Sequence, residues 1–316
     1  QRRRYADGEL IFLVNSSMDE KTSVQLAYPE GNALYELDAL TGKIYTYPAN
    51  GKGSVTFEVE PAGSLLLFIG KGSEKFPARE LQQSATTLPS LNRTTMKRTR
   101  ENVLPVDFCD LHLQNETFRQ IHVSEASDRA FKAHGFRAGN PWNTSVQYRR
   151  NIVDRDTFKS GGYTAKYHFR IDQTVDYSAF RLVAERPCLF TVRVNGVEAE
   201  TLDGEWWLDR SFGVYPAGSL LKHGENVVEL SLSPMKLLAE IEPVYILGDF
   251  GVIPEGIGWS ITAPVQELQL GSWKSQRMPF YSWEVQYSKD YQLDEVGGSY
   301  MVQLGKWNGT VAEVYV

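Results

Sequence analysis

The chain has 316 residues, of which 42% are hydrophobic and 23% charged, and its formal net charge is −6. This length exceeds that of one small domain, so we expect two domains, each with enough apolar residues for its own core. The acidic balance argues against the basic face that a nucleic-acid-binding protein needs. No apolar run is long enough to cross a bilayer, so no membrane span is predicted.

Residues 10–69 are typical of short strands separated by turns. Strict alternation over Val55–Val59 predicts a strand with one buried and one wet face, and the continuous apolar run Leu65–Ile69 predicts a strand covered on both faces. Thr41-Gly42-Lys43 stands between two strand-like runs and predicts a hairpin turn. Closely spaced strands of this kind indicate a β-sandwich over residues 1–72.

The strand pattern is lost after residue 70, where turn residues and the basic run Lys97–Arg100 follow. We therefore predict a connector over residues 73–102. One helix is expected next, with Ser124 as its N-cap and Ala126–Ala133 as its body. Gly135 is expected to end this helix in a left-handed conformation.

Strands resume at Thr164–Ile171, whose alternation predicts a buried face containing Tyr167 and an opposite face containing His168. Further strand-like runs follow, and Asn195-Gly196 is a strong signal for a tight turn. Residues 103–316 are therefore predicted to form a second β-sandwich. The fold class expected for the whole chain is all-β, with two sandwich domains.

The end of the chain repeats the pattern of residues 167–194, and Thr310–Val316 is predicted to be a strand of the second sandwich. This strand-like run stops at Val316, and Gln1–Tyr5 leads directly into a strand. A strand cut short leaves backbone groups unpaired and a core uncovered. We therefore expect the natural polypeptide to continue beyond Val316.

The cysteines and histidines suggest no metal site. Cys109 and Cys188 permit one disulfide, but isolated cysteines are more often small buried hydrophobes. The histidines are scattered and form no ligand pair. The residues themselves therefore predict neither a metal ion nor another cofactor.

Several motifs resemble a known family. Arg3-Arg4, Asp7-Gly8 and Leu10–Asn15 resemble the junction after the catalytic barrel in glycoside hydrolase family 106, the α-L-rhamnosidase-like proteins. Glu185-Arg186-Pro187 and Val192–Gly196 resemble the galactose-binding-like sugar-binding domains shared with family 2 hydrolases. Further matching segments are Leu37-Asp38, Glu60–Ser64, Gly139–Trp142, Gln147–Arg150, Ile241–Val244, Leu247–Phe250, Gly271–Trp273 and Pro279–Ser282.

This resemblance implies that the first sandwich follows a catalytic barrel and that the second is a galactose-binding-like jelly roll, truncated at its C-terminus. The barrel itself is not in this chain, so no catalytic residue is carried over and the fragment is expected to be inactive. The resemblance also implies glycan and the parent's barrel as partners, and a periplasmic or secreted bacterial location. A structural calcium ion is a further implication, although no Asp-rich run supports it.

The strongest candidate site is the pair Trp206-Trp207. Neighbouring residues of a strand face opposite sides, so one of the two rings is expected to be exposed. An exposed ring with charged neighbours suits a sugar, and the alternative is packing against a neighbouring domain. The candidate residues for carbohydrate binding are Trp142, Asp203, Trp206, Trp207, Asp209, Arg210 and Trp273. No pair of carboxylates has a spacing that marks it as catalytic.

Together these observations predict an accessory, carbohydrate-associated C-terminal region of a large glycoside hydrolase. Such a region would support the catalytic barrel of its parent and contact glycan during polysaccharide degradation. The alternative is a free-standing carbohydrate-binding or adhesive β-sandwich protein without catalysis. The abrupt ends of the sequence favour the accessory region.

Overall fold

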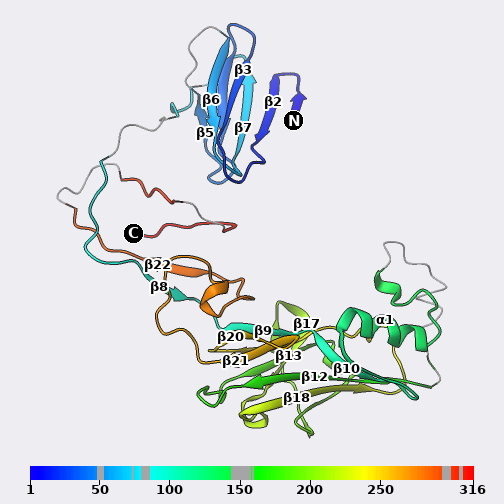
Figure 1. Cartoon of the computed structure of the whole chain (residues 1–316). Helices are drawn as coiled ribbons and strands as arrows, with labels where there is room; N and C mark the ends of the chain where they lie inside the picture. Colours follow the sequence, from blue (N-terminus) through cyan, green and yellow to red (C-terminus); the bar gives the residue numbers. More distant parts are fainter. Residues whose placement is uncertain are drawn as a thin grey trace. The chain divides into compact units, whose positions relative to one another are not determined.

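The computed structural model describes residues 1–47, 53–72, 75–79, 86–143, 158, 160–293, 300–305 and 309–316. By its contacts the chain divides into unit 1, Gln1–Leu88, and unit 2, Pro89–Val316. Regular structure in the described residues is nearly all β-strand, with a single α-helix in unit 2 (Figure 1). The prediction of an all-β fold is therefore confirmed.

Unit 1 is a small sandwich in which a sheet of order β1-β2-β7-β4-β5 packs against the antiparallel pair β3–β6. The strands are β1 (Arg2–Arg4), β2 (Gly8–Val14), β3 (Thr22–Ala27), β4 (Ala33–Leu37), β5 (Ile44–Thr46), β6 (Ser54–Val59) and β7 (Ser64–Gly70). The alternation of β6 is confirmed, since Val55, Phe57 and Val59 are buried. The apolar β7 lies between β2 and β4, but its two faces differ, since Leu67 and Ile69 are buried whereas Leu66 and Phe68 are half-buried, so the expected coverage of both faces is only partial.

The hairpin predicted at Thr41-Gly42-Lys43 joins β4 to β5. The amide of Gly42 donates to the carbonyl of Asp38 at 2.8 Å, and Gly42 has a φ of +70°. The carboxylate of Asp38 accepts from the amide of Leu40 at 3.0 Å. The turn is thus closed by its own backbone and by one local side chain.

Unit 2 is a larger sandwich with two main sheets. The large sheet has the order β11-β10-β12-β18-β14-β15, with β21 joined in parallel to β12 and β20 paired with β21. Its strands are β10 (Phe108–His112), β11 (Thr117–His122), β12 (Tyr163–Ile171), β14 (Thr191–Val194), β15 (Val197–Glu198), β18 (Gly224–Leu232), β20 (Gly251–Glu255) and β21 (Gly258–Thr262).

The small sheet of unit 2 has the order β16-β17-β13-β19-β9 and is antiparallel throughout. Its strands are β9 (Asn102–Val106), β13 (Arg181–Glu185), β16 (Trp206–Trp207), β17 (Asp209–Pro216) and β19 (Val244–Gly248). Figure 1 shows β9, β13 and β17 forming one layer above β12 and β18. A separate ribbon pairs β8 (Thr95–Arg98) with β22 (Val285–Ser288).

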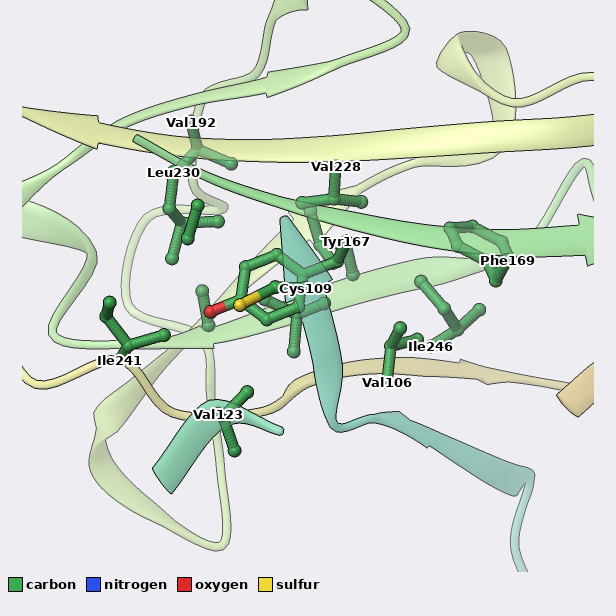
Figure 2. Close-up of a cluster of buried hydrophobic side chains, with 14 of the residues drawn as sticks. Val106, Cys109, Val123, Tyr167, Phe169, Val192, Val228, Leu230, Ile241 and Ile246 are labelled. Atoms are coloured by element: carbon green, nitrogen blue, oxygen red, sulfur yellow. The ribbon is translucent and has the colours of Figure 1, made fainter. Parts of the chain in front are cut away.

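The main core of unit 2 lies between these two sheets. Figure 2 shows Tyr167 of β12 at its centre, with Cys109 of β10 beside it and Ile246 of β19 on the facing layer. Tyr167 and Cys109 are directly opposite in the strand register. Cys109 and Cys188 are both free thiols, and burial raises the pKa of Cys109 to about 12.

Two predictions from strand periodicity in unit 2 are confirmed. In β12 the side chains of the Tyr167 face are buried, whereas His168 is exposed and lies 3.2 Å from a carboxylate oxygen of Glu225. Asn195 and Gly196 both have a positive φ, of 52° and 84°, and join β14 to β15. Positive φ at both central residues is the geometry of a two-residue hairpin turn.

The helix is present as α1 (Val123–Ala133), but the predicted N-cap is wrong. The side chain of His122, which has extended backbone angles, accepts from the amide of Ser124 at 3.2 Å and caps the helix. Strand β11 runs directly into α1, so Ser124 already lies in the first turn. Gly135 has a φ of +91°, as expected for the residue after a helix end.

The strand predicted over Thr310–Val316 is also wrong. This segment contains no strand, and its side chains are exposed. Alternation alone does not make a strand, because pairing and a core to cover are also required. Earlier in the same terminal repeat Val285–Ser288 does form β22, which pairs with β8 within the connector predicted over residues 73–102.

Candidate functional site

A segment over residues 233–243, which we call the strap, links β18 to β19 and contains a turn at Leu237-Leu238, closed by a 3.1 Å hydrogen bond from the amide of Ala239 to the carbonyl of Lys236. Its buried side chains alternate along the chain at Met235, Leu237, Ala239 and Ile241. The strap forms a β-bridge at Lys236 but no strand. Its backbone polar groups therefore need other hydrogen-bond partners.

Two buried tyrosines of β12 donate hydrogen bonds to backbone carbonyls of the strap. The hydroxyl of Tyr163 donates to the carbonyl of Ala239 at 2.9 Å, and that of Tyr167 donates to the carbonyl of Glu242 at 2.8 Å. Burial raises the pKa of both hydroxyl groups well above the ordinary value, so both remain donors. The tyrosines thus fix the strap from inside the core.

Side chains from the segment after α1 also form hydrogen bonds to the strap. Trp142 donates through Nε1 to the carbonyl of Leu237 at 2.9 Å, and the amide side chain of Asn140 donates to Glu240 at 2.7 Å. Gly139 has a φ of +89°, and a Cβ there would meet Asp128 Oδ1 at 1.4 Å, so the close approach requires glycine. The sequence candidate Trp142 thus has a structural role, because its side chain holds the strap in place.

The strap places Glu240 and Glu242 beside Glu185 and Arg186 at the end of β13, and we call these four residues the carboxylate cluster. Arg186 lies 3.1 Å from a carboxylate oxygen of Glu185 and 3.7 Å from one of Glu240. It also donates to the carbonyl of Leu238 at 3.3 Å. Arg186 holds a left-handed backbone with a φ of 46°, a conformation that costs free energy in a residue other than glycine.

One guanidinium cannot neutralise three carboxylates, and the pKa values reflect this imbalance. Burial and the charges of Glu240 and Glu185 together raise the pKa of Glu242 to about 7, against the opposing effect of Arg186. Burial also raises the pKa of Glu185, against the opposing effect of Arg186. The cluster is therefore an acceptor-rich, half-buried surface that takes up a proton near neutral pH.

Three aromatic rings cover the outer surface of the small sheet next to this cluster. The ring centre of Trp207 lies 4.9 Å from that of Tyr245 and 6.2 Å from that of Phe212. They lie on a buried layer made by Val183, Val214 and Leu247. Trp207 therefore anchors β16 to its sheet, as one tryptophan of the pair was expected to do.

The hairpin β16–β17 presents the other tryptophan to solvent. Trp206 is 55% exposed, and Asp203, Asp209 and Arg210 are also exposed. Asp209 accepts two hydrogen bonds from Ser211, which lower the pKa of its carboxyl. The backbone amide of Arg186 donates to the carbonyl of Ser211 at 2.6 Å, which places the start of β17 beside the carboxylate cluster. Trp206, Asp203, Asp209 and Arg210 thus lie exposed on the same hairpin.

Trp273 lies apart from this region, on the segment that follows β21. Its Nε1 donates to the hydroxyl of Tyr287 on β22 at 3.0 Å, and its ring meets that of Tyr281 edge-on at 5.9 Å. Trp273 therefore holds the β8–β22 ribbon. Of the seven sequence candidates, the structure groups Asp203, Trp206, Trp207, Asp209 and Arg210 on one hairpin and places Trp142 and Trp273 in structural contacts.

The partners of this hairpin were not predicted from the sequence as binding residues. Glu185 was considered only among the carboxylates whose spacing marks no catalytic pair and in a matching motif. Glu242 appeared only in a matching motif, and Tyr245 and Phe212 were not considered as site residues. A sequence signal existed in the alternation of residues 235–241, which predicts an extended segment with outward-facing glutamates. Nothing local shows that this segment crosses to the end of β13.

The outer face of the large sheet differs in character. Lys166, Glu229, Arg193 and Glu198 stand opposite one another on successive strands and form ion pairs at 3.1, 3.7 and 3.1 Å. Such a ladder of alternating charge marks a solvated face, and exposed pairs contribute little to stability. The outer surface with aromatic and acceptor groups is that of the small sheet.

In the part of the chain that the structure describes, no group of three or more histidine, cysteine, aspartate or glutamate residues is arranged to hold a metal ion. The calcium ion implied by the resemblance therefore has no ligand set of this kind there. The same part contains no helix with the length and apolarity to cross a bilayer.

No family model matches the sequence, and no curated protein matches it. Solved structures with some similarity are those of glycoside hydrolases. A rhamnosidase from Novosphingobium sp. PP1Y has 12% identity and a TM-score of 0.23 over 77% of this chain and 23% of its own. BuGH86 in complex with neoagarooctaose has 13% identity and a TM-score of 0.21 over 83% of this chain and 34% of its own.

The isomalto-dextranase of Arthrobacter globiformis T6 in complex with panose has 12% identity and a TM-score of 0.18 over 76% of this chain and 35% of its own. The matched parts thus span between 23% and 35% of the length of these three enzymes. At these TM-scores the likeness carries no argument about the fold or the function of this chain.

Proposed function

We propose that this chain is an accessory, carbohydrate-binding region of a larger glycoside hydrolase of the α-L-rhamnosidase-like type. In this proposal residues 103–316 are a galactose-binding-like jelly roll that contacts glycan, and residues 73–102 connect it to the first sandwich. The chain supports the catalytic barrel of its parent outside the cytoplasm. It carries no catalytic residue of its own.

The observation that carries the proposal is the exposed ring of Trp206 on the same hairpin as the exposed charged side chains of Asp209 and Arg210. The apolar C–H face of a sugar ring stacks on an aromatic ring, while carboxylates and guanidinium groups bind its hydroxyl groups. Trp207 anchors the hairpin, so Trp206 needs no ordering when a ligand arrives, and preorganisation of this kind favours binding.

Glycan binding by the whole purified chain tests the proposal. An array that includes α-L-rhamnose-containing oligosaccharides identifies the ligand, and titration calorimetry measures its Kd. We expect Trp206→Ala to weaken binding at least tenfold, because it removes the stacking ring. Ile257→Ala is the matched control, since Ile257 is 56% exposed on a turn between β20 and β21.

Two outcomes contradict the proposal: no glycan on the array binds, or binding is equally strong in the Trp206→Ala variant. The chain is also expected not to hydrolyse aryl α-L-rhamnosides or other aryl glycosides. Turnover that is lost on substitution of a carboxylate in this chain would contradict the accessory role.

A further inference from the structure

An open pocket of about 490 Å³ lies at one end of the unit 2 sandwich. It is formed by the loop from β12 to β13 and the loop from β17 to β18. The residues that matter here are Asp176, Tyr177, Ser178, Gly218, Ser219 and His223. Its volume falls within the range of about 300–1,000 Å³ that is usual for small-molecule sites.

This pocket is separate from the hairpin and the carboxylate cluster. The loop containing Tyr177 precedes the first residue of β13, whereas Glu185 is the last residue of β13. Likewise Gly218 follows the end of β17, whereas Asp209 begins it. Because strands rise about 3.3 Å per residue, the pocket and the carboxylate cluster lie at opposite ends of the same strands.

The two loops that form the pocket are locked together. Gly218 approaches the other loop so closely that a Cβ would lie 1.9 Å from the carbonyl oxygen of Ser178. Its amide donates to the carbonyl of Phe180 at 3.2 Å, and Nε2 of His223 donates to the carbonyl of Val175 at 3.1 Å. The pocket walls are therefore joined by direct contacts from both sides.

A buried asparagine fixes the loop that carries Ser219 and His223. The amide of Asn226 donates to the carbonyls of Lys222 and Gly224 at 2.7 and 3.0 Å, and its oxygen accepts from Asn195 at 2.9 Å. Asn195 also donates to the carbonyl of Leu220 at 2.9 Å. The turn residue Asn195 thus stabilises the pocket loop, and the site is preformed.

The groups around the pocket suit a polyhydroxylated ring. The ring centres of Tyr177 and His223 lie 4.9 Å apart in an edge-on contact, which orients both. The carboxylate of Asp176 accepts from the amide of Ser178 at 2.9 Å, and this bond lowers the pKa of its carboxyl, so it is ionised at neutral pH. Ser219 adds an exposed hydroxyl group.

We propose that this pocket is a second carbohydrate site, which binds one sugar ring at the end of a glycan. Tyr177 provides the apolar surface for the ring, and Asp176, Ser219 and His223 bind its hydroxyl groups. This site goes beyond the proposed function, because it uses none of the residues of the β16–β17 hairpin.

Titration of the whole, isotope-labelled chain with single sugars tests the site without any substitution. L-rhamnose, D-galactose and D-glucose are the probes, and glycerol controls for unspecific polyol effects. We expect one of the sugars to shift the amide signals of residues 175–178 and 218–223 in a saturable way. No saturable shift there with any of the three sugars overturns the proposal.

Substitution then separates the two sites. Tyr177→Ala and His223→Ala are each expected to weaken binding of the single sugar at least tenfold. When either is combined with Trp206→Ala, the loss of affinity for longer glycans that Trp206→Ala causes should stay the same. His223 is exposed whereas Tyr177 is half-buried against the core, so thermal melting checks that both variants fold. If both variants bind the sugar as the unaltered chain does, the proposal is wrong. Loss of single-sugar binding in Trp206→Ala instead assigns that binding to the hairpin and overturns it.

Discussion

The hydroxyl of Tyr167, in the centre of the unit 2 core, donates a hydrogen bond of 2.8 Å to the backbone carbonyl of Glu242. This contact ties the strap, which has the side chain of Glu242 on its outer side, to the middle of β12. Figure 2 shows the hydroxyl oxygen of Tyr167 on the side of Ile241, the neighbour of Glu242. Tyr163 makes a second such contact at Ala239, so both tyrosines link the core to the strap that carries the carboxylate cluster.

We expect Tyr167→Phe to destabilise unit 2 by about 1–3 kcal/mol, because it leaves a carbonyl of the strap without its donor. Tyr163→Phe is expected to act similarly through the carbonyl of Ala239. Urea unfolding followed by circular dichroism measures both. Tyr291→Phe, at an exposed position, is the control and should change the free energy of unfolding by less than about 0.5 kcal/mol.

Asn226→Ala should be among the more damaging single substitutions in unit 2. Asn226 is fully buried and makes hydrogen bonds to Lys222, Gly224 and Asn195, so its loss leaves several buried groups unpaired. We expect a loss of about 3 kcal/mol or more in the free energy of unfolding. Asn92→Ala, which removes an exposed bond to Asp290, is the control, and an equal loss in both variants would contradict the argument.

The raised pKa of Glu242 predicts how stability depends on pH. Below about pH 4 the folded and unfolded chains both hold this proton, and the shift has no effect. As the pH rises to about 7 the unfolded chain ionises first, so the free energy of unfolding falls, and above pH 7 the whole loss is present. The shift corresponds to about 3 kcal/mol, which solvent screening at this half-buried carboxyl reduces to about 1–2 kcal/mol.

Glu242→Gln should therefore raise the free energy of unfolding at pH 8 relative to pH 5, when both are compared with the unaltered chain. Urea titrations at the two pH values measure this difference. Glu255→Gln, at an exposed carboxyl, is the control. If the free energy of unfolding of Glu242→Gln depends on pH as that of the unaltered chain does, the raised pKa of Glu242 is contradicted.

Substitution of the two neighbouring tryptophans should affect the free energy of unfolding to very different extents. Trp207→Ala removes a ring that packs on Tyr245 and Phe212, and is expected to cost about 2–3 kcal/mol of stability. Trp206→Ala is expected to change stability by less than about 0.5 kcal/mol, since its ring is largely exposed. Thermal and urea unfolding of both variants measure this contrast, which equal effects would contradict.

Limited proteolysis tests the connector proposed over residues 73–102. Each unit has its own buried core, and the contact boundary follows Leu88. We expect the first cut before Thr95, because Thr95–Arg98 is protected by pairing with β22. Mass spectrometry of the first fragments locates the cut, and an initial cut inside β9 or β12 would contradict the division.

Periodicity predicted the strands whose partners are close in sequence or whose faces differ strongly. Alternation in β6 and β12 identified their buried faces, and Asn195-Gly196 identified a turn through the preference of these residues for positive φ. The same reasoning failed at Thr310–Val316, where alternation met neither a partner strand nor a core. It also misplaced the helix cap, because the sequence does not reveal that β11 continues without a loop into α1.

The sequence by itself determined that the chain is all-β, that one of the adjacent tryptophans would be exposed, and which side chains of β12 are buried. These properties follow from local periodicity and from the alternation of side chains along a strand. Tertiary structure alone decided that Trp206 is the exposed ring and that the strap brings Glu242 to the end of β13. It also decided that Asn195 supports a pocket loop. Each of these depends on contacts between residues far apart in the chain, which only the packing of the sheets brings together.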